Sequence, residues 1–293
     1  MRIARFSHNG EVNYGRVLGA DAIQGDAAAT AAAAAGSANG NGAGALSESA
    51  GDDMDKLIIA QLDGHPISQG EVKLTGAYHR VAEVRLLPPI VPTKVICIGK
   101  NYADHVEEMG GEKPAEPIIF LKPSTAVCGA YDPIQRPMGI SERVDYEGEL
   151  AVVIGRLGRD VPADRASEVI FGYTIANDVT ARDLQARDGQ WTRAKGFDTF
   201  CPLGPWIETD LDPADLELTT RLNDEVKQHS RTSLLMHHVP ALIAFVSQVM
   251  TLIPGDVLLT GTPAGIGPMA KGDEVSVTIE GIGTLSNPVT DRS

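Results

Sequence analysis

The chain has 293 residues, of which 43% are hydrophobic and 22% charged, a composition typical of a folded globular protein. Its formal net charge of -14 opposes binding to nucleic acid or to an anionic membrane surface, because both require basic side chains to neutralise phosphates. The N-terminus lacks the apolar run of a signal peptide, and no uninterrupted apolar stretch is long enough to span a bilayer. We therefore expect a cytoplasmic protein that binds neither nucleic acid nor membranes.

The start of the chain predicts a small β-rich unit. Residues 2–6, 14–18 and 57–62 have the composition of short strands and are separated by Gly and Asn turns. From about residue 26 to 51 the chain is mostly Ala, Gly, Ser and Asn, and we interpret this tract as a flexible insertion. An alanine-rich helix over residues 27–35 is the competing interpretation, although isolated helices of that length are marginal in water.

A proline-punctuated segment, residues 86–92, predicts an extended link and a domain boundary near Pro92. The chain would then consist of a small N-terminal domain, residues 1–92, and a catalytic domain, residues 93–293. Apolar, β-branched runs in the second part predict strands at residues 94–99, 149–155, 170–176, 257–260 and 274–279. Helical patterns occur at residues 102–109, 181–188 and 239–250. The predicted fold class is therefore mixed α/β, dominated by β-structure.

Three cysteines, Cys97, Cys128 and Cys201, each lie in or beside an apolar stretch. Their number is odd and their spacing shows no pairing. We expect them to be reduced residues of the core.

Two glutamates stand two residues apart in the segment VDYEGELAVVI, residues 144–154. In a strand, alternate side chains share a face, so Glu147 and Glu149 point the same way, while Gly148 leaves the backbone open to close approach. Like charges near a core need a cation between them, and a hard divalent ion with oxygen ligands is the simplest candidate. A solvated strand end with two surface glutamates is the alternative.

A third carboxylate, Asp178, follows the strand predicted at residues 170–176. Thr180 and Asp183 have the spacing of a capping box for the next helix, which would leave Asp178 free to bind an ion. Three carboxylates would leave three octahedral positions for substrate and water. The alternative is that Asp178 itself caps the helix.

His105 and Glu108 are three residues apart in a segment that is helical if the pattern after Asn101 continues. They would then lie on one helix face, where the carboxylate can orient the imidazole as a base. A charged, solvent-facing helix would have the same spacing, so the two interpretations stay open.

Six segments resemble the fumarylacetoacetate hydrolase (FAH) superfamily over most of residues 94–293. In order they are IGKNYADHVEEM, IIFLKPSTAVCG, VDYEGELAVVIG, FGYTIANDVTARDLQ, WTRAKGFDTFCPLGPWI and PGDVLLTGTPAGIGP. The resemblance implies an FAH-type mixed β-roll catalytic domain, usually a homodimer, with Mg²⁺ or Mn²⁺ held by Glu147, Glu149 and Asp178.

The resemblance also implies roles for further residues. It gives His105 and Glu108 as the base dyad, on a segment that is often a mobile lid. It gives Lys195 as a lysine that contacts the substrate, although a surface lysine is the plain alternative. It places Gln185 and Thr262 at substrate-binding positions, although Thr262 could simply be a turn residue.

The function implied is that of a divalent-metal-dependent enzyme acting on a small 2-oxo acid through a metal-stabilised enolate. Our first hypothesis is C–C bond hydrolysis of an acylpyruvate or fumarylacetoacetate-like substrate. Isomerisation of 2-hydroxyhepta-2,4-diene-1,7-dioate or decarboxylation of oxaloacetate on the same scaffold is the alternative. A non-catalytic metabolite-binding protein is the rival of another class. A nucleotide hydrolase is disfavoured because the sequence has no G-x-x-x-x-G-K-[ST] loop.

Overall fold

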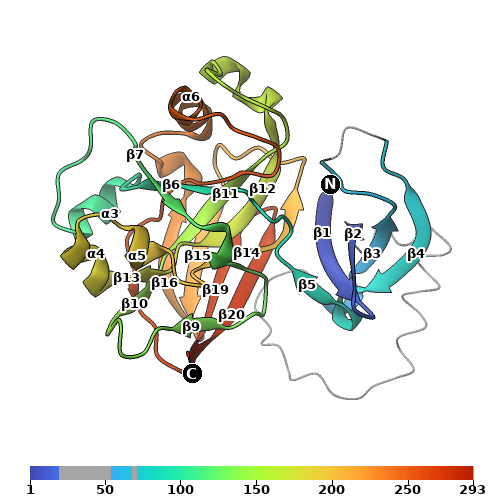
Figure 1. The fold of residues 1–293 in the computed structure, drawn as a ribbon, viewed down its shortest axis with the longest axis horizontal. Coiled ribbons are helices and arrows are strands. Elements are labelled where there is room, and N and C mark those ends of the chain that lie inside the picture. The colour runs from blue at the N-terminus through green and yellow to red at the C-terminus, as the bar shows by residue number, and fades with distance from the viewer. Residues whose placement is uncertain (20–53, 68–70, 293) are drawn as a thin grey trace.

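The computed structural model describes residues 1–19, 54–67 and 71–292. The tract interpreted as a flexible insertion lies outside the described residues. Strands predominate and form three sheets (Figure 1), which confirms the mixed, β-dominated class. Among the described residues, no helix combines the length and the apolar character needed to cross a membrane.

The largest sheet extends through both parts of the chain. Its strands are β1 (Arg2–His8), β2 (Glu11–Leu18), β3 (Ile58–Leu62), β4 (Leu74–Arg80), β5 (Arg85–Leu87), β6 (Val95–Gly99), β7 (Ile118–Lys122), β8 (Val127–Cys128), β11 (Gly148–Ile154), β12 (Ile170–Asn177), β14 (Cys201–Glu208) and β17 (Val257–Leu259). The order is β4-β3-β2-β1-β14-β12-β11-β17-β6-β7, with β5 beside β1 and β8 beside β14. Most neighbours are antiparallel, but β17 runs parallel to β6.

Two smaller sheets complete the catalytic part. The five-stranded sheet, in the order β16-β15-β19-β20-β9, consists of β9 (Ile134–Arg136), β15 (Glu217–Leu222), β16 (Glu225–Arg231), β19 (Glu274–Ile279) and β20 (Gly283–Asp291). The three-stranded sheet consists of β13 (Thr180–Ala181), β10 (Val144–Tyr146) and β18 (Gly267–Pro268). Leu150 and Ile175 of the large sheet share one buried cluster with Leu218 and Val277 of the five-stranded sheet, so the core lies between these two sheets.

Helices are few and short. They are α3 (Ala103–Glu108), α4 (Arg182–Asp188), α5 (Thr192–Lys195) and α6 (Val239–Val249), with 3-10 turns η2 (Met54–Lys56), η3 (Val81–Glu83), η4 (Ser124–Ala126), η5 (Ala163–Glu168) and η6 (Thr232–Leu234). Figure 1 shows α3, α4 and α5 grouped on one side of the sheets and α6 apart from them. In α6 the buried residues recur with the helical period, and this pattern is what predicted the helix from the sequence. They are Val239, Leu242, Ile243 and Val246.

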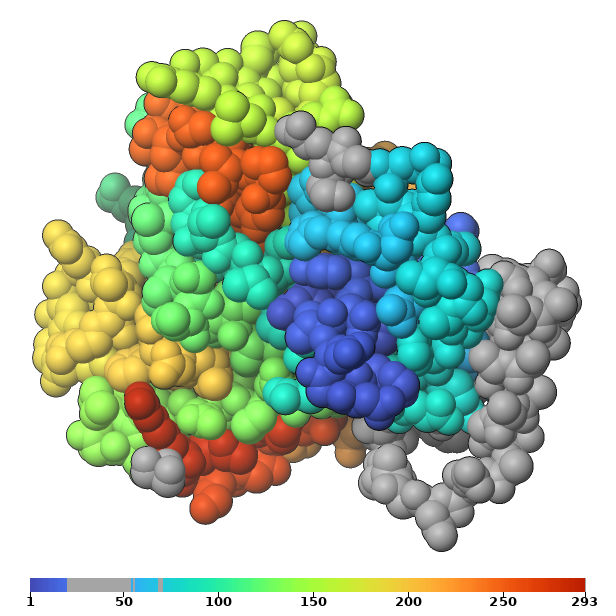
Figure 2. Space-filling model, turned by 45° about the vertical axis from the view of Figure 1, so that its right-hand side comes forward, coloured from blue at the N-terminus to red at the C-terminus, as the bar shows by residue number. Residues whose placement is uncertain are grey.

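The N-terminal strands continue the large sheet. Arg2 and Ile3 of β1 pair with Glu208 and Ile207 of β14. In the space-filling view the blue N-terminal strands lie beside the cyan and green segments that follow (Figure 2). The division of the chain near Pro92 stays a prediction.

Each predicted strand overlaps an observed one, and the three helical patterns coincide with α3, α4 and α6. The sequence did not predict β4, β7, β14, β15, β16 or β20. The three cysteines are buried and free, as expected, and burial raises the pKa of each thiol above its ordinary value.

Candidate active site

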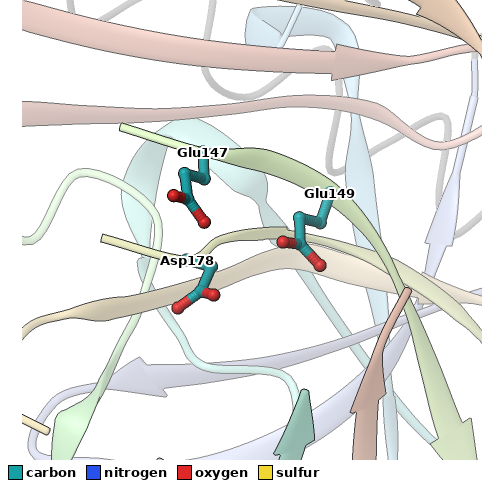
Figure 3. Close-up of side chains that lie close together, drawn as sticks. All are labelled: Glu147, Glu149 and Asp178. Atoms are coloured by element: carbon teal, nitrogen blue, oxygen red, sulfur yellow. The ribbon is translucent and has the colours of Figure 1, made fainter. Parts of the chain in front are cut away.

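The three predicted metal ligands converge in the fold (Figure 3). Glu147 lies between β10 and β11, Glu149 is the second residue of β11, and Asp178 directly follows β12. One carboxylate oxygen of each lies within 4.8 Å of the others, and all three residues are buried. The alternative of two surface glutamates at a strand end is therefore wrong.

The backbone between the two glutamates is fixed by close packing. A Cβ at Gly148 would lie 2.2 Å from Thr220 Oγ1, so β11 approaches the five-stranded sheet too closely for any other residue. Asn177 Oδ1 accepts the N–H of Glu147 at 2.9 Å, and Gln228 Oε1 accepts the N–H of Gly148 at 3.0 Å. The close approach predicted at Gly148 is confirmed, and it holds both carboxylates in place.

Two buried lysines neutralise part of this negative charge. Lys195 Nζ donates to Glu147 Oε2 at 2.9 Å and to Asp178 Oδ2 at 2.6 Å, and Lys122 Nζ donates to Asp178 Oδ1 at 2.6 Å. Burial alone would lower the pKa of Lys195, but Asp178 and Glu147 outweigh it and raise that pKa above its ordinary value. Lys195 is only 2% exposed, which excludes the surface-lysine alternative.

Glu147 is the strongly paired member of the triad. Burial works to raise its pKa, but the positive charges of Lys195 and Arg182, with His105, prevail and lower it below the ordinary range. Glu147 is therefore ionised in the folded protein at neutral pH.

The negative charge of Glu149 is the least compensated of the three. Its carboxylate accepts the N–H of Gly261 at 2.6 Å, and no salt bridge involves it among the described residues. Burial, followed by the negative charges of Asp178 and Glu147, raises the pKa of Glu149 well above its ordinary value. A hard divalent cation favours oxygen ligands and would supply the missing positive charge, so the triad fits such an ion.

Arg182 belongs to the same network, although the sequence did not single it out. Its Nε donates to Asp145 Oδ2 at 2.9 Å, its Nη1 to Gln185 Oε1 at 2.6 Å, and its Nη2 to Glu147. For Lys122 the signal was a lone cation in a largely apolar segment, which is costly to bury unless it is paired. Arg182 begins the charged helix RDLQARD and gave no such signal.

The proposed base dyad lies on α3. His105 Nδ1 is 3.4 Å from Glu108 Oε2, and His105 is 6% exposed, which rules out the solvent-facing alternative for the histidine. The other oxygen of Glu108 accepts the N–H of Gly265 at 3.0 Å, and the hydroxyl of Tyr146 donates to the carbonyl of Gly265 at 3.0 Å. The loop around Gly265 thus holds Glu108 beside the histidine.

A cavity of about 310 Å³ connects these groups. It is lined by the carboxylate triad, by His105, Lys195, Gln185 and Thr262, and by Ile98, Gly99, Lys100, Met109, Phe120, Arg182, Ala186 and Trp191. The structure therefore brings every predicted site residue except Glu108 to one cavity, and Glu108 contacts it through His105. The individual roles of these residues stay predictions.

Two local expectations need correction or qualification. The capping box is wrong: α4 begins after Ala181 without a side-chain cap, and the hydroxyl of Thr180 donates to the carbonyl of Asp178. Asp183 instead accepts the hydroxyl of Ser141 at 2.5 Å. The Thr262 hydroxyl donates to the carbonyl of Gly148 at 2.9 Å and accepts Gln228 Nε2 at 2.8 Å, so it already has structural partners.

Comparison with known proteins places these features in a family. The family model described as fumarylacetoacetate (FAA) hydrolase C-terminal matches residues 94–290. A second model, described as Rv2993c-like, N-terminal, matches residues 44–89. Together the two models match most of the chain.

Two curated relatives extend the comparison. The chain is 61% identical to Protein Rv2993c of Mycobacterium tuberculosis over 231 residues, which cover 78% of this chain and 86% of that protein. It is 43% identical over 244 residues to the mitochondrial oxaloacetate tautomerase Fahd2a of Rattus norvegicus, covering 76% of this chain and 78% of the relative.

Solved structures agree with this similarity. The 2-hydroxyhepta-2,4-diene-1,7-dioate isomerase from Mycobacterium marinum aligns with a TM-score of 0.82 and 47% identity, covering 100% of this chain and 99% of that one. The fumarylpyruvate hydrolase from Pseudomonas aeruginosa, solved with Mn²⁺ and pyruvate, aligns with a TM-score of 0.66 and 32% identity, covering 71% and 92%.

Proposed function

The chain belongs to the fumarylacetoacetate hydrolase family, and we propose that it catalyses proton transfer next to the carbonyl of a small 2-oxo acid with the help of a divalent metal ion. One observation carries the proposal. A base dyad, His105 with Glu108, and the buried triad of Glu147, Glu149 and Asp178 open onto or adjoin the same cavity.

The metal is proposed to be Mg²⁺ or Mn²⁺ held by the three carboxylates. When bound, such an ion supplies positive charge that acidifies the carbon next to a 2-oxo group. The support is the donor set, which is all oxygen, and the excess negative charge at Glu149. The manganese and pyruvate in the fumarylpyruvate hydrolase structure agree with this choice.

The chain's own residues supply the proton chemistry. With the Nδ1 proton of His105 directed to Glu108, the lone pair of Nε2 is free to accept a proton from substrate or water. Glu108 stabilises the resulting imidazolium, and its second oxygen is kept in position by Gly265. Lys195 and Arg182 keep Glu147 ionised and immobile, which preserves the spacing of the triad.

Two outcomes of this proton transfer are candidates. Return of the proton at another carbon or oxygen gives isomerisation or tautomerisation, and the relatives with those names are 43% and 47% identical. Activation of water by His105 gives the C–C hydrolysis of an acylpyruvate expected from the sequence, and a named hydrolase of this kind is 32% identical. We place isomerisation or tautomerisation first and hydrolysis second. Decarboxylation of oxaloacetate, which depends less on this proton transfer, is a third possibility on the same scaffold.

The test is a panel assay with and without EDTA. Hydrogen exchange at the carbon next to the carbonyl is followed by proton NMR in D₂O, enol-to-keto conversion of oxaloacetate by absorbance, and cleavage of acetylpyruvate by product analysis. We expect metal-dependent exchange in the unaltered protein. Exchange that EDTA leaves unchanged, or that is absent with every acid, would contradict the proposal.

His105→Asn separates the outcomes. It removes the base but preserves a polar side chain, so exchange and hydrolysis are expected to fall by about 10²–10⁴-fold. Decarboxylation of oxaloacetate, which depends on positive charge more than on the base, should survive. Equal loss of all activities would count against the role of His105.

The proposed assembly is a homodimer, as is usual in the family that the sequence resembles. Sedimentation equilibrium at micromolar concentration tests it, and a mass near that of one chain, 31.0 kDa, would contradict it.

A further inference from the structure

The strand β16 buries an amide side chain at a position where a core residue would normally be apolar. Gln228 has 0% of its surface exposed, whereas the apolar Val226 of the same strand is exposed. Burial of an amide is costly unless its oxygen and its N–H groups are hydrogen-bonded. The hydrogen-bond partners of Gln228 therefore indicate what the amide does at this position.

The two ends of the amide bind two different segments. Gln228 Oε1 accepts the N–H of Gly148, which lies between the two glutamates of the triad, at 3.0 Å. Gln228 Nε2 donates to Thr262 Oγ1 and to the carbonyl of Pro263, each at 2.8 Å. One side chain thus connects the strand of the glutamates to the loop of residues 261–265.

That loop contacts the triad at one end and the base dyad at the other. The N–H of Gly261 donates to Glu149 at 2.6 Å, and the N–H of Gly265 donates to Glu108 at 3.0 Å. The amide from β16 binds the middle of the loop. It therefore fixes the loop relative to both groups.

An irregularity in β16 brings the strand against the same loop. The register between β15 and β16 shifts between Thr220 and Arg221, which leaves Lys227 without an opposite residue, as in a β-bulge. A Cβ built on Gly265 would lie only 2.0 Å from the carbonyl oxygen of Lys227. Bulges are common next to active sites, where they redirect a side chain. Here the side chain that follows the extra residue is the buried amide.

We propose that Gln228 is a positioning residue that fixes the distance and direction from the carboxylate triad to His105 of the base dyad. Its oxygen acts on the strand of the glutamates, and its nitrogen acts through the loop on Glu108, which contacts His105. Proton transfer depends steeply on such spacing, because a misplacement of about 1 Å can lower a rate by about 10²-fold. Gln228 itself does not line the cavity. The inference rests on the proposed function and adds to it a residue that acts from outside the cavity.

Two substitutions of Gln228 test its contacts. Gln228→Met has a similar length and removes every hydrogen bond of the amide. Gln228→Glu retains an oxygen for the N–H of Gly148 but lacks the N–H donors for Thr262 and Pro263. His229→Asn is the matched control, because His229 is the next residue of β16 and its side chain is 63% exposed. Circular dichroism and urea unfolding establish first that each variant is folded.

The first readout is the distance between metal and base, measured with Mn²⁺. An Mn²⁺ ion at the triad broadens the NMR signals of a nearby histidine ring, and the broadening rises steeply as the distance falls. The signals of His105 are observed with isotope-labelled histidine and assigned with His105→Asn. We expect both Gln228 variants to change the broadening, and His229→Asn to leave it as in the unaltered protein. The affinity for Mn²⁺, measured by calorimetry, should change much less.

The second readout is the enol-to-keto conversion of oxaloacetate. Gln228→Met should lower kcat by about 10–100-fold, the range of a misplaced base, and change KM less. In a Glu108→Gln background the same substitution should lower kcat far less, because the residue through which Gln228 acts is already altered. A residue that is merely structural would lower kcat by the same factor in both backgrounds.

Any of three results would overturn the inference. They are unchanged Mn²⁺ broadening of the His105 signals in both Gln228 variants, an equal effect on kcat with and without Glu108→Gln, or failure of both variants to fold, which would assign Gln228 to stability alone. Metal-dependent turnover by the unaltered protein would still support the proposed function in each case. If the unaltered protein shows neither Mn²⁺ broadening nor turnover, the proposed function fails, and the inference fails with it.

Discussion

Separate replacement of Glu147 and Glu149 by glutamine should affect the metal-free protein very differently, although both residues are buried and only two positions apart. Glu147 shares its charge between Lys195 and Arg182. Glu147→Gln leaves Lys195 with Asp178 alone and Arg182 with Asp145 alone, so the network has one negative charge fewer. Removal of one partner from a buried ion pair costs about 3–5 kcal/mol, so this variant should unfold much more easily.

Glu149→Gln removes a charge that has no cationic partner of its own. The amide oxygen can still accept the N–H of Gly261, and the amide group is neutral beside Asp178 and Glu147, whose charges now raise the pKa of Glu149. The free energy of unfolding in EDTA should therefore change by about 1 kcal/mol or less, a size typical of one neutral hydrogen bond.

Added metal introduces a second difference, between the unaltered protein and Glu149→Gln. An ion at about 100 times its dissociation constant stabilises the unaltered protein by about 2.7 kcal/mol. At about 2–4 °C per kcal/mol this gives a rise in Tm of about 5–10 °C. Glu149→Gln should lose most of this rise, because a neutral ligand replaces a charged one.

The assay is urea and thermal unfolding in EDTA and in Mg²⁺ or Mn²⁺, followed by circular dichroism. Glu107→Gln is the control, because Glu107 is a mostly exposed residue of α3 that pairs with Lys113 at 3.5 Å. Equal destabilisation by Glu147→Gln and Glu149→Gln in EDTA would refute the assignment of charge in the triad. An undiminished metal-dependent rise in Tm for Glu149→Gln would refute its role as a ligand.

The pKa of Glu149 is higher in the folded protein than its ordinary value of 4.5. Above that pH the unfolded chain releases the proton first, so metal-free stability should fall with rising pH, and unfolding in EDTA should show a flatter pH dependence for Glu149→Gln. Gly265 has a φ of 100°, and a Cβ there would lie 2.0 Å from the carbonyl oxygen of Lys227. Gly265→Ala should therefore displace the loop that holds Glu108 and lower kcat. The affinity for Mg²⁺, measured by calorimetry, should stay nearly constant. Thr262→Val removes two buried hydrogen bonds and should lower the free energy of unfolding by about 1–3 kcal/mol in urea, whereas Thr262→Ser should be near neutral.

The triad could be predicted because its signal is local. Glu147 and Glu149 are separated by one glycine, and Asp178 ends an apolar strand, so strand geometry alone brings carboxylates to one edge of a sheet. The dyad of His105 and Glu108 likewise depends only on helical spacing.

The missed strands lack that local signal. In β16 the buried residues are polar, Gln228 and Ser230, so no hydrophobic alternation marks the strand. In β14 every residue is buried, but Pro202, Gly204 and Pro205 interrupt the pattern and would normally argue against a central strand. Pairing with β1 and β12, which are distant in sequence, decides the case of β14. The strand β16 is at the edge of its sheet and pairs with β15, which directly precedes it.

The missed charges have the same cause. Lys122 is buried and Arg182 half-buried because they pair with Asp178, Glu147 and Asp145, and those partners lie up to 56 residues away in sequence. A lone lysine in an apolar segment, such as Lys122 in β7, indicates that a partner exists, but only the fold identifies it.

Different residues of the cavity serve the shared first step and the later steps of the reaction, and this explains why the family is easier to assign than the reaction. Glu147, Glu149 and Asp178 and the dyad on α3 serve every outcome that begins with proton transfer beside a carbonyl, so their presence cannot distinguish isomerisation from hydrolysis. The outcomes differ in what happens at the remote carbon atoms, where water either attacks or is excluded. Trp191 and Lys100 line the same cavity but belong to neither the triad nor the dyad. Substitutions there should therefore change the choice of substrate and product, while substitutions in the triad should abolish all outcomes together.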